Sequence, residues 1–192
     1  MSFRAAIFDL DGTIVETPYD WSKIKAELGT GPVPILSYLE GLREPERSRK
    51  WEILRRYEDE ATQGAILKEG IIPFLKFLAE KNIRTALVTN NSRKNVRTLM
   101  KRFDLEFDCV ISRERGLWKP SGAPLIEVLR RLKLRPSECF AVGDSVFDAA
   151  AARDAGIETV FILSQDKTRF GSFSAQVMST VAELQAMVED LL

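Results

Sequence analysis

The chain has 192 residues, of which 45% are hydrophobic and 29% are charged, a composition typical of a globular domain. Lysine and arginine together number 28, as do aspartate and glutamate, so no overall field favours binding to nucleic acid or to an anionic membrane. The absence of histidine excludes a zinc site of the usual His type and leaves carboxylates or lysines for any proton transfer.

The first predicted strand, residues 4–10, leads directly into two carboxylates. Asp9 and Asp11 share one face of an extended segment, because side chains along a strand alternate with a period of two. Carboxylates this close repel each other by roughly 4 kcal/mol at an effective dielectric constant near 20. Folding alone therefore does not explain why two carboxylates share this face, and the pair indicates a functional site.

Residues 16–70 interrupt the strand–helix alternation of the rest of the chain. Residues 20–28 and 43–62 have the composition and spacing of helices, and the loop-like sequence GTGPVP separates them. This segment is predicted to be a small helical domain inserted into a core made of residues 1–15 and 71–192. The arginines and lysine of its second helix are read as a solvated helix face.

The remaining chain alternates short apolar runs with helical patterns, which predicts an α/β fold with a doubly wound parallel sheet. The near-continuous apolar character of the runs is typical of parallel strands covered on both faces. Cys109 and Cys139 lie in two of these runs and are expected to be reduced, buried thiols. After the first strand, the predicted strands are 83–89, 108–112, 139–144 and 158–163, and the predicted helices include 71–81, 148–156 and one behind a capping box of Thr180 and Glu183.

Polar side chains follow several of these strands, at the edge where an open parallel sheet binds its ligands. Clustered carboxylates with neither histidine nor cysteine beside them favour a hard divalent cation such as Mg²⁺. Thr89, the amides that follow it and a helix N-terminus near Ser92 offer donors for phosphate oxygens. The sequence thus predicts a phosphate site with a metal in it. The residues expected to meet there are Asp9, Asp11, Thr89, Asn90, Lys119, Asp144 and Asp148.

The chain resembles the haloacid dehalogenase superfamily, in particular its capped, phosphoglycolate phosphatase-like branch. Four motifs of that family occur in order over residues 3–163: DLDGT at 9–13, Thr89 after ALV, Lys119 in WKP, and GDSVFD at 143–148. The resemblance implies a Rossmann-like core with a helical cap inserted after the first strand. The sequence KPSGAP departs from the family's usual Lys-Pro-Asp-Pro and leaves open where the next helix begins.

The resemblance also implies the roles of individual residues. Asp9 is expected to be the nucleophile and Asp11 the general acid and base. Thr89, Asn90 and Lys119 are expected to bind the phosphoryl group. Mg²⁺ is expected on Asp9, the backbone carbonyl of Asp11, and Asp144, with Asp148 completing the acidic cluster. The carboxylate at position 11 favours phosphoryl transfer, because the family's dehalogenases lack one there.

The expected activity is Mg²⁺-dependent hydrolysis of a small phosphorylated metabolite, such as phosphoglycolate or a sugar phosphate. A phosphomutase of the same superfamily is the nearer alternative, and a receiver-like signalling domain with an acceptor aspartate is the more distant one. No apolar stretch approaches the roughly 20 residues that span a bilayer, and the first residues do not resemble a signal peptide. A cytoplasmic monomer or small homo-oligomer is therefore expected, without nucleic-acid or membrane partners.

Overall fold

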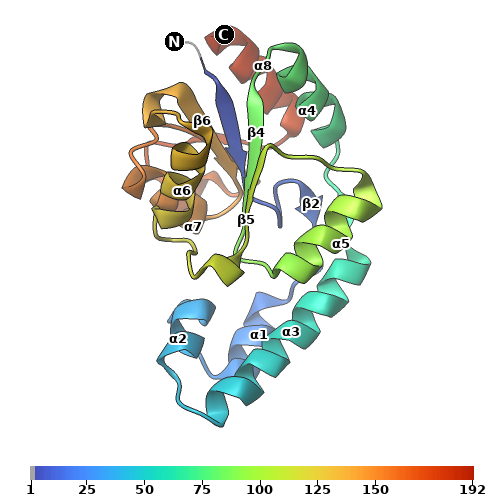
Figure 1. The fold of residues 1–192 in the computed structure, drawn as a ribbon, viewed down its shortest axis with the longest axis vertical. Coiled ribbons are helices and arrows are strands. Elements are labelled where there is room, and N and C mark those ends of the chain that lie inside the picture. Colours follow the sequence, from blue (N-terminus) through green and yellow to red (C-terminus); the bar gives the residue numbers. More distant parts are fainter. Residues whose placement is uncertain (1–2) are drawn as a thin grey trace. The chain divides into compact units, whose positions relative to one another are not determined.

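The computed structural model describes residues 3–192 and divides the chain into two compact units (Figure 1). The first unit contains the residues up to Glu16 together with Ile66–Leu192, and the second contains Thr17–Ala65. Compared with the predicted insertion, 16–70, the second unit begins one residue later and ends five residues earlier. Each unit is described separately below.

A six-stranded, all-parallel sheet forms the centre of the first unit, in the order β5-β4-β1-β6-β7-β8. The predicted α/β class is therefore confirmed, and β1 lies between β4 and β6, where Ile7 is in register with Ala86 and Ala141. Strand β8, at the edge of the sheet, was not expected from the sequence. The strands are β1 Ala5–Phe8, β4 Arg84–Val88, β5 Cys109–Ile111, β6 Cys139–Gly143, β7 Thr159–Leu163 and β8 Gln176–Met178.

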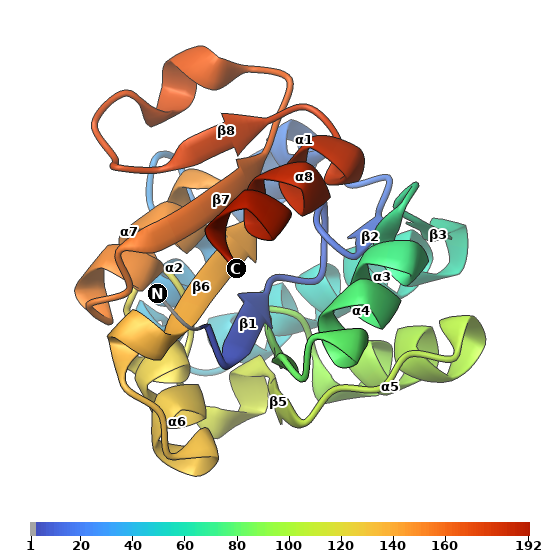
Figure 2. The same ribbon diagram turned by 90° about the horizontal axis from the view of Figure 1, so that it is seen from above.

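Helices cover both faces of this sheet, α6 and α7 on one face and α4 and α8 on the other (Figure 2). The helices of this unit are α4 Ile71–Glu80, α5 Arg93–Phe103, α6 Ala123–Leu132, α7 Val146–Asp154 and α8 Val181–Leu191, with the short 3₁₀ turns η1 Arg113–Arg115, η2 Pro136–Glu138 and η3 Lys167–Phe170. The Thr180 hydroxyl accepts the Glu183 amide at the start of α8, as the capping motif predicts.

Both faces of the central strands are buried, which accounts for their apolar sequences. Ala5 and Ile7 of β1 belong to the core beneath α6 and α7, together with Cys109 and Cys139. Phe8 points to the other face, where its ring meets that of Phe74 edge-on at a centroid separation of 6.0 Å. Both cysteines are buried free thiols, as expected.

A two-stranded antiparallel ribbon carries the chain out of the first unit and back into it. Its strands are β2, Val15–Glu16, and β3, Ile66–Leu67, with Glu16 in register with Ile66. The ribbon continues through a hydrogen bond from the Lys68 amide to the Ile14 carbonyl at 3.0 Å. These pairings place residues 66–70 in the first unit and not in the insertion.

The second unit is helical and consists of α1 Trp21–Leu28, α2 Ile35–Gly41 and α3 Glu46–Gly64. The predicted helix at 20–28 is α1, with Asp20 as its N-cap, whereas α3 begins three residues after the predicted position 43. Helix α2 was not predicted. Leu28, Leu39 and Leu54 are buried and give this unit its own small core.

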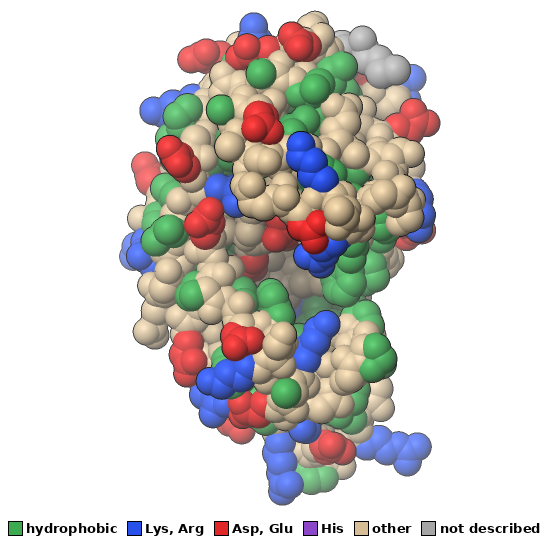
Figure 3. Space-filling view, turned by 180° about the vertical axis from the view of Figure 1, so that it is seen from behind, with side chains coloured by type: hydrophobic (Ala, Val, Ile, Leu, Met, Phe, Trp, Pro, Cys, Tyr) green, Lys and Arg blue, Asp and Glu red, His purple; other side chains and the backbone are tan. Residues whose placement is uncertain are grey.

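Charges of both signs are interspersed over the face of the molecule drawn in Figure 3, in keeping with the equal numbers of basic and acidic residues. Within the described part of the chain, none of the helices has the length and apolar character needed to cross a membrane.

Candidate active site

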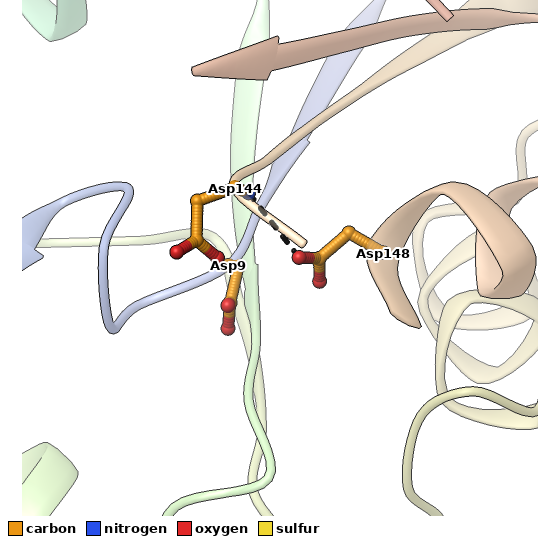
Figure 4. A group of neighbouring side chains, drawn as sticks. All are labelled: Asp9, Asp144 and Asp148. Atoms are coloured by element: carbon orange, nitrogen blue, oxygen red, sulfur yellow. Dashed lines mark hydrogen bonds between the residues drawn. The ribbon is translucent and has the colours of Figure 1, made fainter. Parts of the chain in front are cut away.

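The ends of β1 and β6 bring the first two acidic residues of the site together. Asp9 follows β1, and its amide continues the ladder by donating to the Val142 carbonyl at 2.9 Å. Asp144 follows β6 on the neighbouring strand, and Asp148 lies in the first turn of α7. One carboxylate oxygen from each of Asp9, Asp144 and Asp148 lies within 4.8 Å of the others (Figure 4).

Two glycines allow these carboxylates to approach so closely. A Cβ placed on Gly12 would lie 2.0 Å from Asp144 Oδ2, and Gly12 has a φ of +82°, which side chains rarely adopt. A Cβ on Gly143 would lie 2.3 Å from the Cβ of Asp148. Gly12 of the DLDGT motif therefore shapes the acidic cluster itself, a role that its place in a turn did not reveal.

Lys119 provides the positive charge of the site. Its Nζ lies 2.7 Å from Asp9 Oδ1 and 2.5 Å from Asp148 Oδ1, and only 6% of its side chain is exposed. The Asn90 side-chain amide bonds both backbone groups of Lys119. Asn90 Oδ1 accepts from the Lys119 backbone N–H at 2.8 Å, and Asn90 Nδ2 donates to the Lys119 carbonyl at 2.9 Å. Helix α6 then begins at Ala123, the position that the KPSGAP sequence left open.

The carboxylate of Asp148 joins Lys119 to the turn after β6. Oδ1 accepts from Lys119, while Oδ2 accepts from the Ser145 hydroxyl at 2.5 Å and from the Ser145 amide at 3.0 Å. The Asp144 amide also donates to Oδ2, at 3.2 Å. Asp148 thus fixes both the lysine and the loop that carries Asp144. Ser145 was expected at this edge of the sheet as a polar residue after the strand, but no role was predicted for it.

Negative charge exceeds positive charge in this cluster. Burial raises the pKa of Asp9 well above its usual value; Lys119 opposes the rise, and Asp148, Asp144 and Asp11 add to it. Burial and then the neighbouring Asp148 raise the pKa of Asp144 to about 7. Burial also works against the Lys119 ammonium, but Asp148 and Asp9 outweigh it and raise the lysine's pKa. The single ammonium of Lys119 therefore does not balance the three carboxylates of the cluster.

The donor set fits a hard divalent cation. The converging ligand atoms are carboxylate oxygens, and the nearest nitrogen is an ammonium, which cannot bind a metal. A cation placed among the oxygens would offset the repulsion between the carboxylates, which adds to the rise that burial causes in the pKa of Asp9 and Asp144. The residues present are thus compatible with Mg²⁺.

Asp11 lies beside this group, but its carboxylate is not a member of it. Asp11 Oδ2 accepts a hydrogen bond from Asn91 Nδ2 at 3.1 Å. The next residue, Gly12, donates its amide to the Val15 carbonyl at 2.7 Å, which turns the chain towards β2. Asn91 was expected among the polar residues that follow the predicted strand 83–89, but no contact with Asp11 was predicted for it.

Thr89 follows β4 and is almost fully buried. Its Oγ1 accepts the Asn91 amide at 3.0 Å, so the hydroxyl proton can be donated to a phosphoryl oxygen. The backbone amides at the start of α5 were expected to face a phosphate group, and in the structure they have other partners. The amides there donate within the protein: Ser92 to Asn91 Oδ1, Arg93 to the Glu114 carboxylate, and Asn95 to Ser92 Oγ.

Comparison with known proteins gives the relationships of the chain. The sequence profile described as haloacid dehalogenase-like hydrolase matches residues 6–162. A phosphoglycolate phosphatase of Nitrosospira multiformis is 29% identical over 184 residues, which cover 81% of this chain and 81% of that protein. The pyrophosphatase PpaX of Anoxybacillus flavithermus is 27% identical over 180 residues, which cover 83% of each chain.

A solved structure agrees with the fold. The crystal structure of a HAD-superfamily hydrolase from Ehrlichia chaffeensis superposes with a TM-score of 0.70 at 24% sequence identity, over 100% of this chain and 98% of that one. The similarity extends over both units of the present chain.

Proposed function

The chain belongs to the haloacid dehalogenase-like hydrolase family, and on that premise we propose that it is a Mg²⁺-dependent phosphomonoester hydrolase that forms an aspartyl-phosphate on Asp9. The observation that carries the proposal is the position of the Lys119 ammonium, 2.7 Å from Asp9 and 2.5 Å from Asp148, at the carboxyl ends of β1 and β6. A carboxylate held beside a fixed positive charge can accept a phosphoryl group whose oxygens that charge also attracts.

The reaction divides into two transfers. In the first, the Asp9 carboxylate attacks phosphorus; a bond from carboxylate oxygen to phosphorus forms as the ester bond to the alcohol breaks. Asp11 gives a proton to the departing alkoxide. In the second, water attacks the same phosphorus and gives a proton to Asp11, and inorganic phosphate leaves as the Asp9 carboxylate is restored.

Lys119 and Thr89 are proposed to bind the transferring phosphoryl group. The raised pKa of Lys119 keeps the amine charged, and the Thr89 hydroxyl can donate a hydrogen bond. For Asn90, which we also expected on the substrate, the two hydrogen bonds to the Lys119 peptide support a different part: it holds the loop that presents the lysine.

Asp9 and Asp144, with the backbone carbonyl of Asp11, are proposed to hold the Mg²⁺ ion. When bound, the ion supplies positive charge that neutralises the phosphoryl oxygens and the carboxylates around them. Asp148 supports the arrangement by holding Lys119 and the Asp144 loop.

The proposed substrate is a small phosphorylated acid or sugar phosphate. The name of the Nitrosospira multiformis relative supports phosphoglycolate, and the name of the Anoxybacillus flavithermus relative adds pyrophosphate to the candidates. We assign to residues 17–65 the part of the cap, the segment that selects the leaving group in this family.

The proposal is tested by phosphate release from a panel of phosphorylated metabolites and pyrophosphate, with and without Mg²⁺. We expect Mg²⁺-dependent release that Asp9→Asn lowers by roughly 10³-fold or more. Glu158→Gln, a change at an exposed acidic residue of the same unit, is the matched control and should leave the rate unchanged.

Other outcomes would identify the alternatives. Isomerised sugar phosphate without free phosphate, in the presence of a bisphosphorylated activator, would indicate a phosphomutase. A long-lived phosphoprotein without turnover would indicate a receiver-like domain. If Asp9→Asn hydrolyses the panel as fast as the wild type, Asp9 is not the nucleophile.

A further inference from the structure

We infer that Asn91 is the positioning residue for the general acid: it fixes the Asp11 carboxyl for proton transfer to the leaving group. The inference rests on the proposed function, because it concerns the part of Asp11 in that reaction. Its basis is the 3.1 Å hydrogen bond from Asn91 Nδ2 to Asp11 Oδ2, between side chains 80 residues apart in the sequence.

The hydrogen bonds to Asn91 Oδ1 determine which end of the side-chain amide faces Asp11. The Ser92 backbone amide lies 2.7 Å from Asn91 Oδ1, and a backbone N–H can only donate, so the atom that it meets is the oxygen. Asn95 Nδ2 donates to the same oxygen at 3.4 Å. The NH₂ group of Asn91 is therefore the end that faces Asp11.

The surroundings leave this amide little freedom to move. Asn91 is 4% exposed and Asn95 is 2% exposed. The Asn91 backbone is held as well, by donation of its amide to Thr89 Oγ1 at 3.0 Å and by acceptance of the Arg113 amide at its carbonyl at 3.3 Å. A donor fixed in this way restricts rotation of the carboxyl group to which it is bonded.

This restriction matters for the proton transfers of Asp11 in particular. A general acid assists only when its proton points at the oxygen that departs, and fixed orientation contributes to the rate through proximity. Oδ2 of Asp11 is held by the Asn91 donor, so the carboxyl plane keeps one direction during both proton transfers. Asn91 touches neither the phosphoryl group nor the metal in this account; it acts through Asp11 alone.

The identity of the leaving group separates this role from a purely structural one. An alkoxide needs a proton as it departs, whereas p-nitrophenolate is a good leaving group that departs without one. Loss of acid positioning should therefore slow alkyl phosphate hydrolysis and leave p-nitrophenyl phosphate hydrolysis nearly unchanged. Damage to the fold, to Lys119 or to the metal site would slow both reactions alike.

The experiment compares kcat/KM for p-nitrophenyl phosphate and for the best alkyl phosphate of the panel. Asn91→Ala should lower the alkyl rate relative to the aryl rate by about 10-fold or more, a part of the 10²–10⁴-fold that general acids contribute. Asn91→Leu is the second variant: its side chain has nearly the size of asparagine, adds no charge to the acidic cluster and cannot donate to Asp11. It should show the same selective loss.

Two controls accompany these variants. Asn90→Ala removes the neighbouring amide, whose partner is the Lys119 peptide, and should slow both esters by a similar factor. In an Asp11→Asn background, Asn91→Ala should change the ratio of the two rates no further, because the group that it positions is already absent.

Equal losses on both esters in Asn91→Ala and Asn91→Leu, or no loss on either ester, would overturn the inference. The wild-type activity would then leave the proposed function intact. A wild type that hydrolyses neither ester would instead overturn the proposed function, and the role of Asn91 with it.

Discussion

Asp148 shows how much of the site depends on single oxygen atoms. Oδ1 receives the Lys119 ammonium and Oδ2 receives the amide and hydroxyl of Ser145. Removal of one partner from a buried, hydrogen-bonded charge pair costs about 3–5 kcal/mol, because the other charge stays buried without compensation. The charged side chains of the site therefore support the local structure as well as the proposed chemistry.

Gly12 offers a direct test of the geometry of the carboxylates. In Gly12→Ala the new Cβ would lie 2.0 Å from Asp144 Oδ2, so the Asp144 carboxylate must shift from its position. We expect loss of Mg²⁺-dependent phosphate release together with destabilisation. The two effects are measured by phosphate release and by chemical denaturation.

Gly31→Ala is the matched control for that substitution. Gly31 also has a positive φ, +56°, but a Cβ there would meet nothing within 4 Å. Because alanine is strained at this φ, Gly31→Ala should lower the free energy of unfolding by about 1–2 kcal/mol, and it should retain activity. Full activity in Gly12→Ala would contradict the described position of Asp144.

At the level of elements, the order of the strands determines which side chains meet. Because β1 lies beside both β4 and β6, the residues that follow these strands share one edge of the sheet. Alternation of apolar runs and helices was enough to predict this sheet. The edge rule for parallel strands predicts that Asp9, Thr89 and Asp144 converge, and the structure brings the carboxylates of Asp9 and Asp144 together.

The sequence did not predict features that depend on tertiary contacts or on short segments. The hydrogen bond from Asn91 to Asp11 joins residues 80 apart, and no local pattern encodes it. The ribbon of β2 and β3 has two residues in each strand, too few to show an alternation of side chains. The predicted insertion therefore extended to residue 70, five residues beyond the end of the second unit. The sequence pattern likewise missed α2 and β8.

The strands also protect the two thiols of the chain. Burial raises the pKa of Cys139 to about 12 and raises that of Cys109. A higher thiol pKa means that a smaller fraction of each thiol is present as the reactive thiolate. We expect both thiols to resist a disulfide reagent in the native protein and to react at once in denaturant. Rapid labelling of native protein would contradict the described burial.

For the whole molecule, we expect the excess of acidic groups in one cluster to couple folding to cation binding. The protein carries equal numbers of basic and acidic residues, yet the site concentrates Asp9, Asp144 and Asp148 around a single lysine. A ligand that binds the folded state alone stabilises it by mass action. Mg²⁺ should therefore stabilise the folded chain as well as support its reaction.

The expected size of this stabilisation can be measured by thermal unfolding. At a Mg²⁺ concentration about 100 times the dissociation constant, the gain is about 2.7 kcal/mol, which corresponds to roughly 5–10 °C in Tm for a chain of this size. Asp144→Asn should lose most of the shift and Glu158→Gln should keep it. Equal shifts in Asp144→Asn and the wild type would place the ion elsewhere.

The central claim is that Asp9 becomes covalently phosphorylated during turnover. The most direct measurement is an acid-quenched single turnover with the best substrate of the panel, followed by mass spectrometry of the peptide that contains Asp9. The account predicts a transient phosphoryl group on Asp9 that appears before free phosphate and is absent in Asp9→Asn. Release of phosphate with no phosphoryl group on Asp9 at any quench time, or with that group on another residue, would contradict it.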